Sequence, residues 1–284
     1  MSARPRNNTM RFLNMWSVWI IVCAIGLVGL LSSAASAQEP ANAAREHDQE
    51  MQMGAQLFDQ LKSEGEIVSE SPLYGVLAPL SSAITKVVEP KYGYPIHFYI
   101  VHETQPNAFA APGGNIYVTD SLFYFVKNTQ ELSGTLCHET SHLLHDDSMA
   151  LLQKDADIRA RAIAATILLG PTMRTILLAT AIGELDSLHY SREAEEQADL
   201  TGSDTCAAAD YNPWGLVWLF KDFSNADMKQ PPEILSNHPD FQHRIAALEE
   251  HFKEDPVVFA RFNNMESTAT PLHVPKDEAE KFLR

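Results

Sequence analysis

Apolar residues return at helical spacing in two stretches of the first third of the chain. In residues 46–61 the spaced positions are Met51, Leu57 and Leu61, and in residues 73–88 they are Leu77, Leu80, Ile84 and Val88. Positions three, four or seven apart share one face of a helix. The pattern therefore predicts two helices, each with one side against a core.

A small sheet is predicted to follow these helices. Residues 94–101 are rich in β-branched and aromatic side chains, and Gly113-Gly114 predicts a turn into a second strand at residues 115–119. Helical patterns then return at residues 191–210, after Pro213, and from residue 236 to Phe252. We therefore predict an α+β fold, a mainly helical domain with a small β-sheet beside it, and an irregular stretch from Asp255 on that ends in a short helix.

The strongly apolar run at residues 15–31 has the surroundings of a secretory signal peptide. Arg4, Arg6 and Arg11 precede it, and Ala35-Ser36-Ala37 supplies the small residues of a cleavage site. We expect cleavage after Ala37, which would make the protein periplasmic or secreted. An uncleaved membrane anchor is the alternative, because the run is nearly long enough to cross a bilayer.

The chain is acidic, with a formal net charge of -16. Loss of the three arginines with the signal peptide would change the charge to about -19, which argues against nucleic acid and anionic lipid headgroups as partners. The roughly 250 remaining residues suit one domain, and no internal repeat is visible. We expect a leader at residues 38–46, the domain at 47–254 and a C-terminal tail at 255–284.

A second apolar run, residues 158–182, is broken by Gly170-Pro171 and carries Arg174. A proline breaks or kinks a helix and an arginine is costly at the centre of a bilayer, so two short helices in a hairpin fit better than one membrane span. Buried core is one interpretation of this hairpin. A mobile cover over a cleft, or a surface for a membrane or an envelope protein partner, is the other.

The sequence His138-Glu139-Thr140-Ser141-His142 carries the strongest chemical signal. Residues four apart lie on one face of a helix, so His138 and His142 can hold one metal ion between their imidazoles. Glu139 then lies beside the metal, where a carboxylate can take a proton from a water molecule that the metal has made more acidic. This pattern predicts a hydrolytic zinc site.

A third ligand is available in the acidic helical stretch that begins at Ser191. Glu195 and Asp199 lie four apart on one face. Glu195 can complete a site of two histidines and one glutamate that leaves the fourth position to water, as in catalytic zinc enzymes. Asp199 falls where a carboxylate could orient a ligating histidine.

These motifs together resemble the gluzincins of metallopeptidase family forty-eight, and in particular a soluble, exported branch without a repeat domain. Two further stretches match the family pattern: residues 107–118, and His238-Pro239 with Arg244. The resemblance implies a zincin-like fold, one Zn²⁺ per chain and a peptidase activity. It also implies a substrate-binding role for the residues before the second strand, which are Asn107, Ala108, Phe109, Ala110, Pro112, Gly113 and Gly114.

The resemblance bears on the second strand and on His238. Proteases commonly bind substrate as an added strand at a sheet edge, and the resemblance favours such an edge at residues 115–119, although the spacing equally allows an interior strand. It places His238 and Arg244 over the active site. His238 is either a donor to the oxyanion of the reaction, which we favour, or a zinc ligand that holds the site shut, with Arg244 holding the loop or adding positive potential.

The chain departs from the family at two places. Thr140 and Ser141 stand where small or aliphatic residues are usual, and Asp146 and Asp147 stand where an Arg-His pair is frequent. Neither departure falls on a predicted ligand, so we expect them to affect specificity and not metal binding.

Two cysteines, Cys137 and Cys206, would remain in an oxidising compartment after cleavage. Cys137 adjoins a ligand, whereas Cys206 lies eleven residues beyond Glu195, about 16 Å along a helix. A disulfide requires Cα atoms within about 7 Å, so this geometry predicts two buried thiols.

The sequence as a whole predicts an exported zinc endopeptidase that cuts extended or misfolded envelope proteins in protein quality control. The alternative is a chaperone-like or regulatory binding protein that keeps the zinc site but rarely cuts. A purely structural zinc site is disfavoured, because such sites normally have four protein ligands and are often rich in cysteine.

Overall fold

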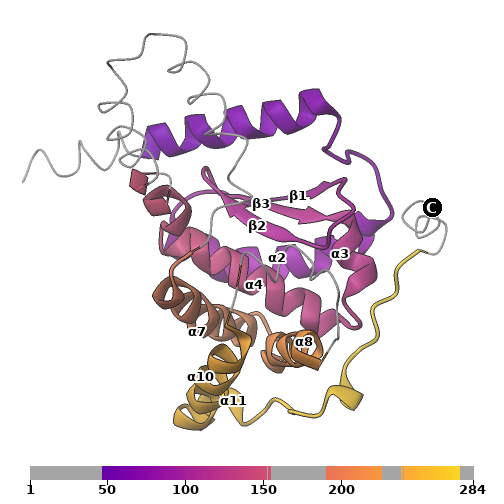
Figure 1. Cartoon of the computed structure of the whole chain (residues 1–284), viewed down its shortest axis with the longest axis vertical. Coiled ribbons are helices and arrows are strands. Elements are labelled where there is room, and N and C mark those ends of the chain that lie inside the picture. Colours follow the sequence, from indigo (N-terminus) through magenta and orange to yellow (C-terminus); the bar gives the residue numbers. More distant parts are fainter. Residues whose placement is uncertain (1–46, 152, 155–189, 226–237, 239, 276–284) are drawn as a thin grey trace, which may run out of the picture. The chain divides into compact units, whose positions relative to one another are not determined.

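The structure, a computed structural model, describes residues 47–275 except 152, 155–189, 226–237 and 239. Its elements are α2 (Leu73–Tyr92), β1 (His97–Val101), β2 (Ala108–Ala111), β3 (Asn115–Thr119), α3 (Asp120–Phe125), α4 (Thr129–Leu144), α7 (Arg192–Ala208), α8 (Trp214–Asn225), α10 (Phe241–Glu254), α11 (Pro256–Phe259) and the 3-10 helix η3 (Glu266–Thr268) (Figure 1). Residues 47–64 and 147–151 are also helical. The predicted α+β fold, mainly helical with a small sheet, is confirmed.

The sheet has the strand order β1-β3-β2. β1 pairs with β3 in parallel, and β2 pairs with β3 in an antiparallel hairpin whose turn holds Gly113 and Gly114 at φ +77° and +74°. The expectation that residues 115–119 form an exposed edge is therefore wrong, because β3 is the central strand and all five of its residues are buried. The edge strand on that side is β2.

The two faces of the sheet bury different helices. Leu57, from the first described helix, packs with Val101, Ala111 and Tyr117 on one face. On the other face, α2 and α4 cover the sheet, as Figure 1 shows for the strands and the helices below them. Alternation of side chains along each strand places successive residues on opposite faces, so both sides of this short sheet must be apolar.

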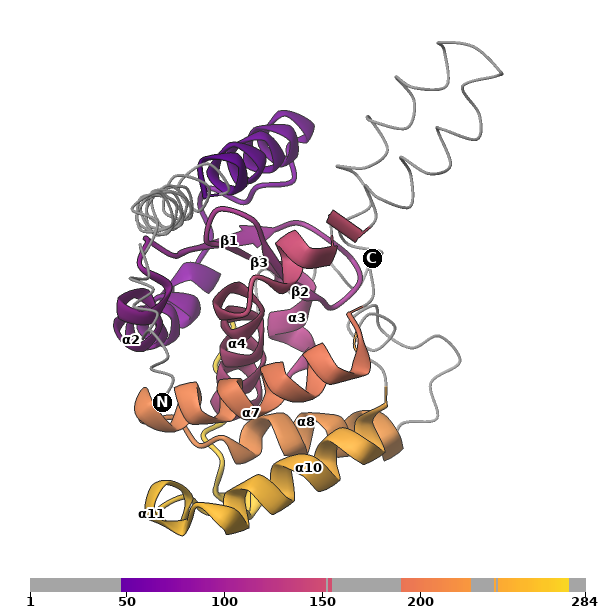
Figure 2. The same cartoon turned by 90° about the vertical axis from the view of Figure 1, so that its left-hand side faces the viewer.

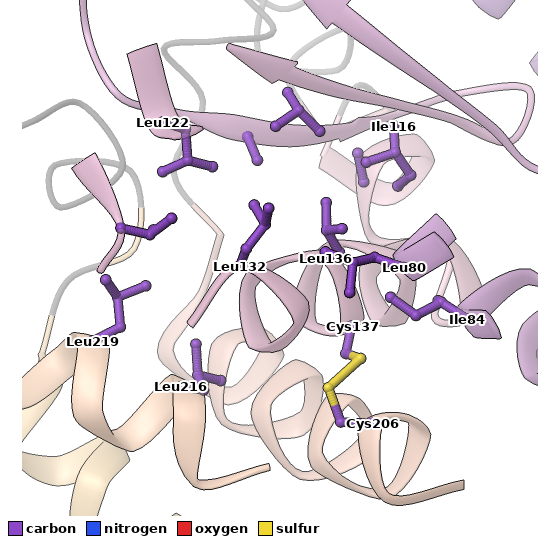
Figure 3. Close-up of a cluster of buried hydrophobic side chains, with 14 of the residues drawn as sticks. Leu80, Ile84, Ile116, Leu122, Leu132, Leu136, Cys137, Cys206, Leu216 and Leu219 are labelled. Atoms are coloured by element: carbon purple, nitrogen blue, oxygen red, sulfur yellow. A yellow bond between two sulfur atoms is a disulfide. The ribbon is translucent and has the colours of Figure 1, made fainter. Parts of the chain in front are cut away.

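Helix α4 is the central element, and every residue from Glu131 to Leu143 is buried. Leu132 and Leu136 point into a cluster built from the sheet, α2 and α8 (Figure 3). The hydroxyl groups of Thr140 and Ser141 both donate to the carbonyl of Cys137, so they stay hydrogen-bonded inside the core. A helix buried on all sides can hold its polar side chains in fixed positions.

Helix α7 lies directly against α4 because Gly202 lets the two backbones approach. A Cβ atom at Gly202 would lie 3.0 Å from the Cα of His138. One turn beyond Gly202, Cys206 forms a disulfide with Cys137, with the two Cα atoms 5.8 Å apart (Figure 3). The expected pair of free thiols is therefore wrong. The backbone of α4 at His138 lies against Gly202, one turn before Cys206. The sequence argument measured the distance to Cys206 from Glu195 instead, and it therefore overestimated the separation of the two cysteines.

The carboxyl-terminal helices pack beside this pair. In Figure 2, α7, α8 and α10 run side by side below α4. The predicted irregular stretch after Asp255 is wrong in its first part, because α11 begins at Pro256 and its Phe259 is buried in the core. The apolar run at 158–182, the signal sequence and the leader lie outside the described residues. Within the described ranges, no helix is long and apolar enough to cross a membrane.

Candidate active site

Four buried side chains bring one donor atom each to a common point. They are His138 and His142 of α4, Glu195 of α7, and His238, which precedes α10; their donor atoms all lie within 4.8 Å of one another. The i, i+4 spacing of the histidines places both imidazoles on one face of α4, and Glu195 reaches them from the first turns of α7. The structure thus brings together the three residues predicted as metal ligands, and His238 with them.

The distances between these donors fit a zinc ion. Four-coordinate zinc with bonds of about 2.0–2.1 Å separates neighbouring donors by roughly 3.3 Å. Nε2 of His138 lies 3.1 Å from Nε2 of His142, 3.5 Å from a Glu195 oxygen and 3.3 Å from Nδ1 of His238. Two neutral imidazoles and a carboxylate are also the donor types that zinc prefers.

Asp199, with Arg244 bonded to it, lies on the side of the His138 ring that faces away from the other donors. Nδ1 of His138 lies 2.9 Å from Asp199, whose carboxylate accepts two bonds of 2.6 Å from Arg244. Burial by itself lowers the pKa of His138, but hydrogen bonding of the imidazolium to the Asp199 and Glu195 carboxylates outweighs this effect and raises the pKa to about 9. Burial by itself would raise the pKa of Asp199, yet the Arg244 charge keeps that pKa below its usual value. Asp199 thus lies next to the imidazole that we predicted it to orient, and the orienting role itself stays a prediction.

His142 has a carboxylate partner of its own that the sequence did not reveal. Nδ1 of His142 lies 2.8 Å from Asp147. Burial, and then the charge of His138, lower the pKa of His142 well below its usual value. Asp147 was one of the departures from the family pattern that we expected to leave metal binding alone. Asp147 lies against His142, one of the predicted ligands, so an effect of Asp147 on metal binding becomes a prediction to test.

Glu139 stands beside the donor group without belonging to it. Its Oε2 accepts a hydrogen bond of 2.9 Å from the backbone N–H of Ala110, at the middle of edge strand β2. Its Oε1 makes no hydrogen bond within the described part of the chain and lies 3.6 Å from Nε2 of His238. Burial raises the pKa of Glu139. A buried carboxylate with one free oxygen aimed at the site has the form of a general base.

Arg244 holds His238 in place from the core. Its Nη1 donates to the His238 carbonyl at 3.0 Å and lies 2.9 Å from Glu195, while its guanidinium stacks 4.4 Å above the Phe220 ring. Burial by itself lowers the pKa of Arg244, but the charge of Asp199 and Glu195 raises it. Arg244 thus contacts one of the four donors, Glu195, directly, and it also holds the main chain of His238.

The residues predicted to bind substrate divide into two groups. Ala108, Phe109 and Ala110 lie on β2, and the Ala110 N–H faces Glu139. Asn107, Pro112, Gly113 and Gly114 shape the ends of the hairpin: the Gly113 N–H donates to Glu50, and a Cβ at Gly114 would lie 2.4 Å from the Pro95 carbonyl oxygen. Of the first group, Ala110 contacts Glu139 directly, whereas the Phe109 ring stacks on Tyr117.

Tyr190 and Ser148 also belong to the site, and sequence reasoning missed both. The Tyr190 ring stacks on His142 with centroids 3.9 Å apart, and its hydroxyl lies 3.0 Å from that of Ser148. Burial raises the pKa of Tyr190. Tyr190 lies five residues before Glu195, outside the helix that carries the ligand, so no helical periodicity linked it to the motif.

Comparison with known proteins places this site in a family. The profile described as "Peptidase family M48" matches residues 80–252, which include all four donors and Glu139. The chain belongs to peptidase family M48. This confirms the resemblance noted in the sequence, with the zincin-like α+β domain that it implied.

Relatives within family M48 match over part of their length. The chain is 26% identical over 208 residues to the beta-barrel assembly-enhancing protease of Escherichia coli (strain K12), covering 70% of this chain and 42% of that protein. It is 26% identical over 163 residues to mitochondrial metalloendopeptidase OMA1 of Schizosaccharomyces pombe, covering 56% and 47%. The chain thus spans less than half the length of these M48 relatives.

Proposed function

We propose that the protein is an exported zinc-dependent endopeptidase that hydrolyses peptide bonds in extended or misfolded envelope proteins. Membership of family M48 and the donors of His138, His142 and Glu195 support a metallopeptidase. The observation that carries the proposal is the place of Glu139, a buried carboxylate beside the donors with one oxygen free of hydrogen bonds to the described residues. A site that only held a metal would have no use for such a group.

The residues divide the work of hydrolysis among them. A zinc ion on His138, His142 and Glu195 would supply Lewis-acid chemistry, polarising the scissile carbonyl and making water more acidic. Glu139 takes the proton of the attacking water at Oε1 and later gives a proton to the leaving amine. Asp147 is hydrogen-bonded to Nδ1 of His142, and Asp199 lies 2.9 Å from Nδ1 of His138. With Nδ1 turned to a carboxylate in each ring, the Nε2 lone pair faces the site.

His238 acts as a gate in this proposal. Its Nδ1 lies 2.8 Å from Glu195 and 3.3 Å from Nε2 of His138, which is where a fourth ligand would lie. A catalytic zinc site needs that fourth position for water or substrate. These distances favour the gate over the oxyanion donor that we preferred from the sequence, so the His238 ring must move before water can enter.

Export is supported by the disulfide between Cys137 and Cys206. Such bonds persist in secreted and periplasmic proteins and are rare in the cytosol. The predicted signal peptide lies outside the described residues. Sequencing of the purified protein's amino terminus tests the location directly: we expect Gln38 as the first residue, and a chain that begins at Met1 and fractionates with membranes would instead be anchored.

The activity is tested by digestion of unfolded casein. Cleavage should stop with a zinc chelator and return when zinc is added. A metal-loaded protein that binds casein but leaves it intact would point to the chaperone-like alternative. Envelope extracts of cells that carry the wild type or Glu139→Gln can then be compared, because proteins that accumulate with the variant are candidate substrates.

A further inference from the structure

Two side chains hydrogen-bond to the main chain of Ala110, one at its N–H and one at its carbonyl, both of which face away from β3. Its N–H donates to Glu139 at 2.9 Å, and its carbonyl accepts a hydrogen bond of 3.0 Å from the Ser148 hydroxyl. The opposite side of β2 pairs with β3. The edge strand nearest to the metal site therefore offers no free main-chain partner at this residue.

Ser148 is connected to the candidate metal site through contacts with Tyr190. The two hydroxyl groups lie 3.0 Å apart, and the Tyr190 ring stacks on the ligand His142 at 3.9 Å. Ser148 is only 5% exposed, and Tyr190 is partly buried. Ser148 lies shortly after α4 and Tyr190 shortly before α7, and their hydroxyl groups meet at this edge.

An extended substrate would need the Ala110 carbonyl, to which Ser148 donates a hydrogen bond. A peptide that adds to β2 as a further strand pairs its amide N–H groups with outward-facing carbonyls of β2. The Ala110 carbonyl belongs to the same residue whose N–H contacts Glu139, so it is the acceptor nearest to the general base. An N–H close to the bond that is cut would therefore compete with Ser148 for that carbonyl.

We propose that Ser148 and Tyr190 form a latch on the Ala110 carbonyl, which the substrate main chain opens by replacing the Ser148 hydroxyl. This inference rests on the proposed function. When the substrate displaces it, the Ser148 hydroxyl keeps its hydrogen bond with Tyr190 and loses the one to Ala110, so opening the latch costs one hydrogen bond that the substrate N–H replaces at the carbonyl. The latch selects extended chains with a free amide N–H at this position. It disfavours peptides that cannot replace the Ser148 hydroxyl at the Ala110 carbonyl.

The test is to measure binding and cleavage with Ser148→Ala and Tyr190→Phe. We expect Ser148→Ala to lower KM, and the dissociation constant of a labelled decapeptide on the metal-free protein, by about five- to tenfold, which corresponds to the loss of one hydrogen bond. The kcat value should change less than twofold. Tyr190→Phe should act in the same direction but less strongly, since Ser148 keeps its bond to Ala110. Ser203→Ala, which removes a buried hydroxyl that donates to the Leu200 carbonyl within α7, is the matched control and should change neither constant.

A set of decapeptides with single N-methylated amides sharpens the test. One of them should gain nothing from Ser148→Ala, because it lacks the N–H that meets Ala110. Equal peptide affinity of the wild type and Ser148→Ala would overturn the latch. So would a Tyr190→Phe variant with lower kcat and unchanged KM, since Tyr190 would then act on the reaction itself. Failure of the wild type to cleave any peptide would overturn the proposed function instead, and the binding measurement would still decide on the latch.

Discussion

At the scale of single residues, each ligating histidine has a carboxylate on its second ring nitrogen. Asp199 serves His138 and Asp147 serves His142. Such partners fix the tautomer and the direction of the ring, so the metal meets lone pairs that already point at it. In the proposed site the acidic residues would therefore have two roles: Glu195 would bind the metal, and Asp199 and Asp147 would orient the histidines.

Substitution of these carboxylates should separate the two roles. Glu195→Ala should lose zinc, because it removes a ligand, whereas Asp199→Ala and Asp147→Ala should bind zinc about 10–100-fold more weakly through lost orientation. Zinc content by elemental analysis and zinc affinity by chelator competition measure the difference. Glu193→Ala changes an exposed carboxylate two residues from Glu195 and is the control. Equal zinc content in Glu195→Ala and the wild type would assign the third ligand to another residue.

His238→Ala should raise kcat on an unfolded substrate about three- to tenfold, because it removes the side chain at the fourth ligand position while three ligands remain. Steady-state kinetics on the zinc-loaded variant measures the change. His243→Ala, an exposed histidine five residues further on, should have no effect. A fall of about a hundredfold, which is the usual loss for one oxyanion donor, would show that His238 stabilises the developing charge instead.

At the scale of elements, the site depends on how closely α4 and α7 pack. His138 and His142 are held on one helix and Glu195 on the other, so the relative position of the helices sets the distances between the ligands. Gly202 permits the close approach and the disulfide next to His138 holds it.

Replacement of both cysteines, Cys137→Ala with Cys206→Ala, should lower the free energy of unfolding by roughly 2–4 kcal/mol, as expected for a bond that closes a long loop. The two cysteines are 69 residues apart in the sequence. Urea unfolding of the zinc-loaded proteins measures the change, and thiol titration of the unfolded wild type without reductant should detect neither cysteine. An unchanged midpoint would mean that packing at Gly202 holds the helices without the bond.

Local patterns in the sequence were sufficient to predict most elements and the side chains that gather at the candidate site. Helical periodicity placed α2 and α7, and the i, i+4 spacing of His138 and His142 pointed to the donor group that the structure assembles. Contacts between elements were not predictable in this way. Which elements lie together decides the strand order, the Cys137–Cys206 disulfide and the contacts of Asp147 and Tyr190. A local sequence pattern does not contain that information.

At the scale of the whole molecule, the edge strand and the metal site meet at one residue. Ala110 belongs to β2, contacts the general base through its N–H and contacts Ser148 through its carbonyl. If the proposed function is correct, Ala110 connects substrate binding along the sheet edge with chemistry at the metal. Such an enzyme would act on extended main chain with little need of a particular side-chain sequence, which suits the unfolded polypeptides that we propose as substrates.

The most direct test of the central claim is a paired measurement of zinc content and casein cleavage on Glu139→Gln. Glutamine keeps the size of the side chain and can still accept the Ala110 hydrogen bond through its carbonyl, but it cannot take a proton from water. We predict one zinc ion per chain, a melting temperature close to that of the wild type and no detectable cleavage. Cleavage at the wild-type rate by the zinc-loaded variant would contradict the assignment of Glu139 as the general base.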